Sequence, residues 1–210
     1  SLKLMEKVFG KEINDLKFFR YNFFEFNENK FLISRSGYSK QGGYEIHIEN
    51  LKAGLNLYDY FFEIGNEFNL KPGAPNLIER IEGGLLSYGN DMDIGDNPLE
   101  CGFDKYVDLE SDIIFLGKEN LKKIKKEGIK KKLMGVKIEG KSINLIKGLS
   151  MLNSDNQEIG ELRSAAFSPK FKKIVGIAMV KKDFCKINEK FKIKLESTVM
   201  PGEICNLPIS

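Results

Sequence analysis

Apolar and polar residues repeat with two different periods in the first part of the chain. Residues 1–10 place apolar side chains at helical spacing, which predicts a helix. Strands are then predicted at about 18–26 and 30–34, with a turn at 27–29 between them, and again at 44–48. This succession indicates a sandwich-like layer of helices and strands.

A long helix is predicted to begin after Asn50, a residue type that often caps helix N-termini, and to run over about 51–68. Its apolar residues recur at helical spacing, so we expect them to face the core. They are Leu51, Leu55, Tyr58, Phe61, Phe62 and Gly65. A shorter helix is predicted over about 76–86, where Arg80 and Glu82 lie off the apolar face and are expected to tie the helix to its neighbours.

The last eighty residues or so change to short strand-like runs separated by turn residues. These runs are 133–139, 158–166, 174–180, 191–196 and 202–207. Five short strands in this space predict a small antiparallel barrel or sandwich. The predicted fold class is therefore α+β, with a sandwich-like domain over 1–128 followed by a β-barrel domain over 129–210.

Composition places the chain among globular proteins, since 41% of its residues are hydrophobic and 30% are charged. The net charge is only +3, which does not call for a polyanionic partner. One strongly basic run, over 122–132, begins within a predicted helix at 117–127 and continues beyond its end. Three interpretations of this run stay open: it is a solvated helix end, it contacts phosphate, or it binds an acidic protein face. It lacks the interleaved aromatic residues that stack on bases, so no nucleic-acid partner is expected.

Cysteine and histidine content excludes several kinds of site. Cys101, Cys185 and Cys205 form no CxxC pair, which argues against a disulfide framework and favours a reducing, cytoplasmic compartment. His47 is the only histidine, so histidine-rich metal centres are excluded and no metal is expected. No apolar run reaches membrane-spanning length and no signal-peptide pattern opens the sequence, so no membrane partner is expected.

A glycine-rich loop at 34–45 joins two predicted strands and ends at Glu45. Strand alternation places Glu45 and His47 on one face, opposite the apolar residues of the same strand. One interpretation is an ordinary hairpin with a polar outer face. The other is a pocket for a flat, amide-like heterocycle such as a pterin, because a carboxylate accepts two parallel hydrogen bonds from adjacent N–H groups.

Four segments carry a resemblance to a known family. Residues 34–48, SRSGYSKQGGYEIHI, resemble R-T-G-Y-T-G-E-x-G-x-E-I, and residues 80–93 resemble R-L-E-A-G-x-x-L-Y-G-x-D-x-D. Residues 115–119 resemble F-[IL]-G-[KR]-E, and residues 164–178 resemble S-G-x-x-S-P-x-x-x-x-x-I-A-x-A. These four motifs resemble those of the glycine cleavage T-protein (aminomethyltransferase) family and occur in the same order as in that family.

Within that family the sequence most resembles the branch that demethylates the sulfonium dimethylsulfoniopropionate. The resemblance implies tetrahydrofolate as methyl acceptor and a small sulfonium as the partner molecule. The products would be methylmercaptopropionate and 5-methyltetrahydrofolate. Aminomethyltransferases usually carry an arginine where this chain has Asn76, which argues against the T-protein version of the activity.

Folate-binding roles for four residues follow from the resemblance. Glu45 matches the glutamate that grips the N–H edge of the pterin. Tyr38 is a candidate wall for the pterin or sulfonium site, with packing on a helix as the alternative. His47 shares the Glu45 face and Tyr88 is a candidate contact, although a semi-exposed, structural histidine is the simpler interpretation.

The same resemblance implies that the catalytic acidic residue lies upstream of this chain. We therefore expect a C-terminal fragment that is inactive alone and whose partner is the missing N-terminal part of the same protein; a homodimer stays open. Two alternative hypotheses stay open. The first is that the chain belongs to an aminomethyltransferase of the glycine cleavage system, and the second is that it is a folate-binding module without transferase activity.

Overall fold

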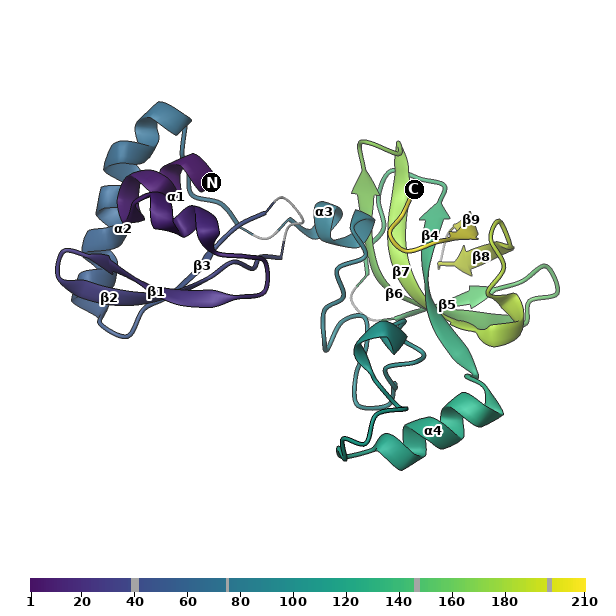
Figure 1. Ribbon diagram of the computed structural model, residues 1–210. Helices are drawn as coiled ribbons and strands as arrows, with labels where there is room; N and C mark the ends of the chain where they lie inside the picture. Colours follow the sequence, from purple (N-terminus) through teal and green to yellow (C-terminus); the bar gives the residue numbers. More distant parts are fainter. Residues whose placement is uncertain (39–41, 75, 146–147, 196–197) are drawn as a thin grey trace. The chain divides into compact units, whose positions relative to one another are not determined.

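The computed structural model describes every residue except 39–41, 75, 146–147 and 196–197. Residues Ser39, Lys40 and Gln41 of the glycine loop thus lie outside the described part. The chain divides into two compact units, Ser1–Asn76 and Leu77–Ser210 (Figure 1). The predicted domain boundary near residue 129 stays a prediction.

Unit 1 combines two helices with a three-stranded antiparallel sheet in the order β1-β2-β3. Its elements are α1 Leu2–Phe9, a 3-10 helix Lys11–Asp15, β1 Tyr21–Phe26, β2 Asn29–Ser34, β3 Glu45–His47, α2 Leu51–Gly65 and a 3-10 helix Asn66–Phe68. The β1–β2 turn has left-handed backbone at both Asn27, φ 47°, and Glu28, φ 61°. Such a turn matches the twist of the strands it joins, so it holds them in register.

One face of this sheet packs against both helices (Figure 1). Phe24 and Ile33 from the strands meet Phe9 of α1 and Leu57 of α2 in one buried cluster. The paired strands alternate, so the side chains of the next residues along each strand lie on the opposite, outer face. On that outer face Phe23 is 56% exposed.

The prediction that α2 buries Leu51, Leu55 and Tyr58 is wrong, because all three are exposed, Leu51 to 74%. The buried residues of α2 are Ala53, Gly54, Leu57 and Gly65, so Gly65 is the member of the predicted stripe that is buried, and Phe61 packs partly against the core. A Cβ on Gly54 would lie 2.4 Å from Ile48 Cγ2, so the glycine lets the helix approach the end of β3 closely. The predicted N-cap is confirmed, since the Asn50 side chain accepts a hydrogen bond from the Ala53 amide at 3.1 Å.

Unit 2 is built on a closed six-stranded antiparallel barrel in the order β4-β7-β6-β5-β8-β9. Its elements are α3 Leu77–Glu82, a 3-10 helix Asp104–Tyr106, α4 Lys118–Glu127, β4 Lys131–Ile138, β5 Leu149–Leu152, β6 Glu158–Ser168, β7 Lys173–Lys181, a 3-10 helix Lys182–Phe184, β8 Lys190–Lys194 and β9 Val199–Cys205. The α+β prediction with a terminal barrel is confirmed. The sequence pattern missed β5, which has only four residues.

Helix α3 is held against the barrel by polar contacts, as expected for Arg80 and Glu82. Arg80 donates to Ser164 Oγ of β6 at 2.9 Å and to Asp91 Oδ2 at 2.5 Å. Ser168 Oγ donates to Glu82 Oε1 at 2.6 Å. These bonds fix the α3 segment to one side of the barrel.

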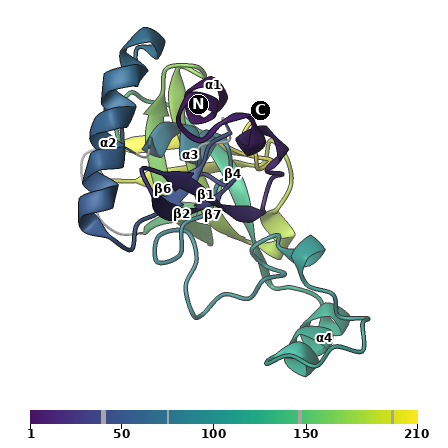
Figure 2. The same cartoon turned by 60° about the vertical axis from the view of Figure 1, so that its left-hand side comes forward.

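Helix α4 stands away from the barrel wall in both views of the molecule (Figures 1 and 2). Its exposed lysines form ion pairs with Glu110, Glu119 and Glu127, which lie before and along the helix. Among the described residues, no helix has the length and apolar character needed to cross a bilayer.

Candidate functional site

The outer face of the unit 1 sheet brings together two of the predicted site residues. Strand β3 directs Glu45 and His47 to this face, and Ile46 between them packs toward the core. Across the sheet, Glu45 pairs with Ser34 of β2, and His47 pairs with Leu32. The predicted alternation of β3 therefore holds in the structure.

Ser36, whose hydroxyl lies next to that of Ser34, holds the Glu45 carboxylate on this face. Ser36 Oγ donates to Glu45 Oε2, and the Ser34 and Ser36 hydroxyls lie 2.9 Å apart. Oε1 of Glu45 has no hydrogen-bond partner among the described residues. Within the described residues one carboxylate oxygen thus bonds to Ser36, and a carboxylate can accept further hydrogen bonds at either oxygen.

Next to Glu45 the same face forms an open hollow of about 300 Å³. Phe23 of β1 and Leu32 of β2 form its apolar floor, since these two residues pair across the sheet. Lys30, His47 and Glu49 complete its lining. An apolar floor with a few polar groups around it is typical of small-molecule sites.

Sequence reasoning missed Ser36, Phe23, Lys30 and Glu49. The motif drew attention to the glycines and to Glu45, whereas Phe23 and Lys30 join the site only through the pairing of β1 with β2. Ser36 and Glu49 lie in the segments just after β2 and just after β3. The signal that was available is the alternation of β1, which places Phe23 opposite the buried Phe24.

The other two predicted residues stand as follows. Tyr38 lies in the loop before β3 and is partly exposed. Tyr88 belongs to unit 2, where it forms an isolated bridge with Met92 and is 68% exposed. The folate-binding roles of Tyr38, His47, Tyr88 and Glu45 remain predictions.

We expect Ser36→Ala to weaken folate binding without unfolding unit 1. The change removes one hydrogen bond to a carboxylate on an exposed face, which corresponds to about 1 kcal/mol or roughly a fivefold rise in Kd. Ser36→Thr keeps the hydroxyl and serves as the matched control. Titration with tetrahydrofolate measures both variants, and equal affinities for Ala and Thr would remove Ser36 from the site.

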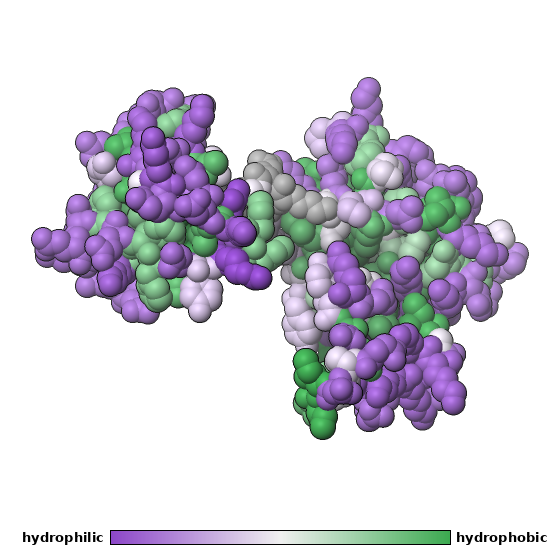
Figure 3. Space-filling view, in the orientation of Figure 1, coloured by the Kyte–Doolittle hydropathy of each residue, from purple (hydrophilic) through white to green (hydrophobic). Residues whose placement is uncertain are grey.

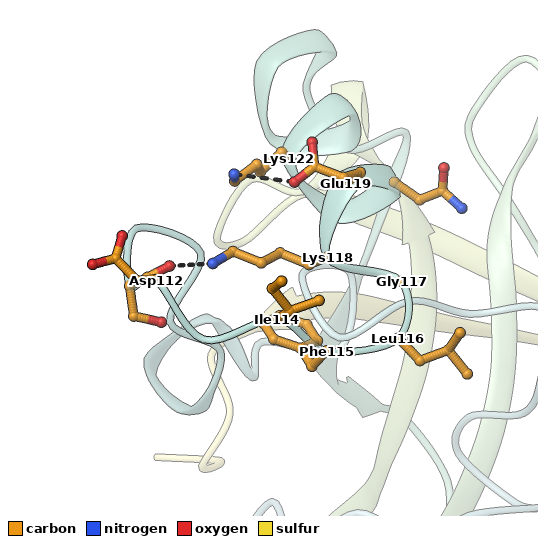
Figure 4. Close-up of a pocket in the computed structure, with 10 residues that line it drawn as sticks. Asp112, Ile114, Phe115, Leu116, Gly117, Lys118, Glu119 and Lys122 are labelled. Atoms are coloured by element: carbon orange, nitrogen blue, oxygen red, sulfur yellow. Dashed lines mark hydrogen bonds and ion pairs between the residues drawn. The ribbon is translucent and has the colours of Figure 1, made fainter.

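A wider hollow of about 740 Å³ lies in unit 2 between the segment before α4 and the first turn of that helix (Figure 4). The Lys118 ammonium crosses it and donates to the carbonyls of Ser111 and Ile113, which fixes the segment. Ile114 and Leu116 remain exposed there. In Figure 3 a hydrophobic tip shows beside the hydrophilic surface of the α4 region. This hollow contains none of the predicted site residues.

Cysteine chemistry is disfavoured in unit 2. Burial raises the pKa of Cys101 and that of Cys205 to about 11. Both thiols are therefore protonated at neutral pH, and a protonated thiol is a poor nucleophile.

The buried carboxylate of Asp96, next to β6, has a lowered pKa, in contrast to the raised pKa values of the two cysteines. Burial alone would raise the pKa of Asp96, but hydrogen bonds from Arg163 and Lys131 outweigh it and hold the pKa at about 2, below the usual 3.8. The Asp96 side chain is 1% exposed and ion-paired to both cations. This network ties the loop after α3 to the barrel strands β4 and β6.

We expect Asp96 to make unit 2 acid-sensitive. Because its pKa is lower in the folded state, its contribution is complete above pH 3.8 and is lost as the pH falls toward 2. At neutral pH the contribution of Asp96 to the free energy of unfolding is about 2 kcal/mol. Urea unfolding of Asp96→Asn should show this loss at pH 7 and a weaker dependence on pH between 4 and 2. An unchanged acid dependence would contradict the assignment.

Family comparisons agree with this architecture. The model of the GCVT N-terminal domain matches residues 1–111, and that of the glycine cleavage T-protein C-terminal barrel domain matches residues 131–209. The dimethylsulfoniopropionate demethylase of Ruegeria pomeroyi is 39% identical over 177 residues, which cover 84% of this chain and 48% of that protein. An aminomethyltransferase of Halothermothrix orenii is 31% identical over 99% of this chain and 58% of its own length.

A solved structure shares the fold. The glycine cleavage system aminomethyltransferase T of Bartonella henselae superposes with a TM-score of 0.84 at 21% identity, over 98% of this chain and 56% of that one. The chain thus spans about half the length of the relatives it matches. With both family domains matched in order along the sequence, the chain belongs to the glycine cleavage T-protein (aminomethyltransferase) family.

Proposed function

We propose that this chain is part of a tetrahydrofolate-dependent methyltransferase that demethylates dimethylsulfoniopropionate. The observation that carries the proposal is the outer sheet face, where Glu45 is fixed by Ser36 beside an apolar floor. The higher identity to the Ruegeria pomeroyi demethylase, 39% against 31% for the aminomethyltransferase of Halothermothrix orenii, supports the sulfonium as donor.

The residues present fit a reduced pterin. A pterin offers two adjacent N–H groups on one edge, and a carboxylate accepts such a pair through two parallel bonds. Glu45 Oε1 has no partner among the described residues, and Oε2 has capacity beyond its bond to Ser36. The flat ring would lie against the exposed apolar side chains of the same sheet face.

In the proposed reaction one carbon–sulfur bond breaks with its electron pair going to sulfur, the methyl carbon bonds to N5 of tetrahydrofolate, and the N5 proton is released. The sulfonium is already an activated methyl donor. The task of the chain is therefore to align donor and acceptor and to exclude water, which supplies a large part of such rate enhancements. We assign no residue of this chain to the acid that would assist the acceptor nitrogen.

The second candidate is aminomethyl transfer in the glycine cleavage system. It is supported by the aminomethyltransferase of Halothermothrix orenii, which aligns over 99% of this chain, whereas the demethylase aligns over 84%. Asn76, in the place of the usual arginine, speaks for the sulfonium instead. A folate-binding module without transferase activity is the third.

A donor panel separates these candidates. The full-length gene product that contains this chain is mixed with tetrahydrofolate and, separately, with dimethylsulfoniopropionate, dimethylglycine or an aminomethyl-loaded carrier protein. We expect 5-methyltetrahydrofolate and methylmercaptopropionate from the sulfonium alone. Transfer from the carrier would favour the second candidate, and folate binding without any turnover would favour the third.

We propose that the enzyme is located in the cytoplasm. All three cysteines are free thiols, with Cys101 and Cys205 buried, as suits a reducing compartment. Neither nucleic acid nor a membrane is part of the proposal. Gel filtration of the gene product will decide between a monomer and a homodimer.

A further inference from the structure

We propose that the 300 Å³ hollow beside Glu45 is the binding site of the methyl donor, a small zwitterion with an onium group at one end and a carboxylate at the other. This inference rests on the proposed function and adds to it a place for the donor. It concerns five residues of unit 1: Phe23, Lys30, Leu32, His47 and Glu49.

The hollow is lined by one basic residue, Lys30, and one acidic residue, Glu49, around an apolar floor. Phe23 lines the hollow and is 56% exposed, so its ring is accessible to a ligand there, and aromatic rings attract onium cations. Glu49 adds a carboxylate that also attracts a cation. A sulfonium or a quaternary ammonium, which has no N–H or O–H to donate, is bound through such contacts rather than through hydrogen bonds.

Lys30 supplies the opposite charge. Its nearest acid is Glu25, at 3.7 Å, and both side chains are about 70% exposed, 70% and 69%. An exposed pair of this kind is weak, because solvent screens it. The Lys30 ammonium therefore remains available to the carboxylate of a bound zwitterion.

The position of the hollow suits a transfer to folate held by Glu45. His47 and Leu32 form one cross-strand pair, and Glu45 and Ser34 form the next pair on the same face. Two residues along a strand span about 7 Å. A pterin gripped at its N–H edge by Glu45 can extend over that distance, which brings its reacting side to the donor.

The size of the hollow also selects the ligand. A volume of about 300 Å³ is at the lower limit of small-molecule sites, so it suits a donor of a few heavy atoms and is too small for a complete folate. The hollow and the Glu45 region are thus two neighbouring subsites on one sheet face.

The test is donor binding to the full-length gene product, measured by calorimetry without folate. The probes are dimethylsulfoniopropionate and 4-methylpentanoate, in which an uncharged carbon replaces the sulfonium sulfur. We expect the sulfonium to bind at least about threefold more tightly than the carbon analogue. Phe23→Leu and Glu49→Gln should each remove most of that difference, and Lys30→Gln should weaken both probes about equally.

Phe19→Leu and Glu28→Gln are matched controls, because both positions are exposed on unit 1 outside the hollow. Tetrahydrofolate binding is measured in parallel with wild-type protein and Glu45→Gln. Folate binding that depends on Glu45, together with sulfonium affinity that is unchanged in Phe23→Leu and Glu49→Gln, would overturn the donor site alone. Folate binding that is absent or independent of Glu45 would overturn the proposed function as well.

Discussion

Glu45→Gln is expected to reduce the affinity of the full-length gene product for tetrahydrofolate by about 10- to 150-fold for each charge-assisted bond lost, or about 1.5–3 kcal/mol per bond. Glutamine keeps the size of the side chain but replaces one acceptor oxygen with a donor. The new N–H₂ group would face a pterin N–H, and Ser36 would lose its ionised acceptor.

Asp59→Asn is the control for this change, because it removes one exposed carboxylate from α2 in the same unit. Equilibrium dialysis or calorimetry with tetrahydrofolate measures both variants. Circular dichroism checks that each is folded, and we expect no loss, since Glu45 is exposed and lies at the end of the sheet. Equal folate affinities in the wild type and Glu45→Gln would exclude this carboxylate from the site.

The largest loss of stability is expected from Asp91→Ala in unit 2. Asp91 is fully buried and accepts hydrogen bonds from Arg80 at 2.5 Å and from the Ser87 amide at 2.7 Å. Its removal leaves the buried Arg80 guanidinium without a counter-charge, which costs about 3–5 kcal/mol. Urea unfolding of the 210-residue chain, followed on the transition of the barrel, measures the loss.

Two controls make the reason for this loss clear. Glu127→Gln breaks the exposed pair with Lys123, at 3.9 Å, and should change stability by less than about 0.5 kcal/mol. The double variant Arg80→Met, Asp91→Leu removes both charges, so it should recover much of what Asp91→Ala loses. If the double variant is no more stable than the single one, an unpaired arginine is not the cause.

Much of the fold followed from periodicity. Alternation predicted β8, where Phe191 and Ile193 are buried between lysines, and the Asn50 cap predicted the start of α2. Strand β5 was missed because its four residues, between a glycine and a turn, give too short a pattern for a period of two to appear.

The error in α2 has a different origin. Hydrophobicity and helical spacing both favoured Leu51, Leu55 and Tyr58 as the buried side, yet close approach to Ile48 requires the small face with Ala53 and Gly54. The short distance between α2 and the end of β3 determines which face of the helix is buried, and this distance cannot be derived from a single sequence.

The candidate site shows the same limit. Glu45 and His47 were predicted on one face from the alternation of a single strand. Ser34, Phe23 and Lys30 come from other strands, and only the register of β1 with β2 and β3 places them beside these two residues. Local pattern therefore identified the acidic residue, while its surroundings depended on tertiary pairing.

The central claim is that the Glu45 carboxylate binds the N–H edge of a reduced pterin. Its most direct test is a crystal structure of the full-length gene product with tetrahydrofolate. We predict that the two Glu45 oxygens lie within about 2.7–3.1 Å of the pterin ring N–H and amino nitrogens, with the ring over the outer face of β1-β2-β3. A pterin bound elsewhere, with Glu45 in contact only with Ser36 and water, would contradict the claim.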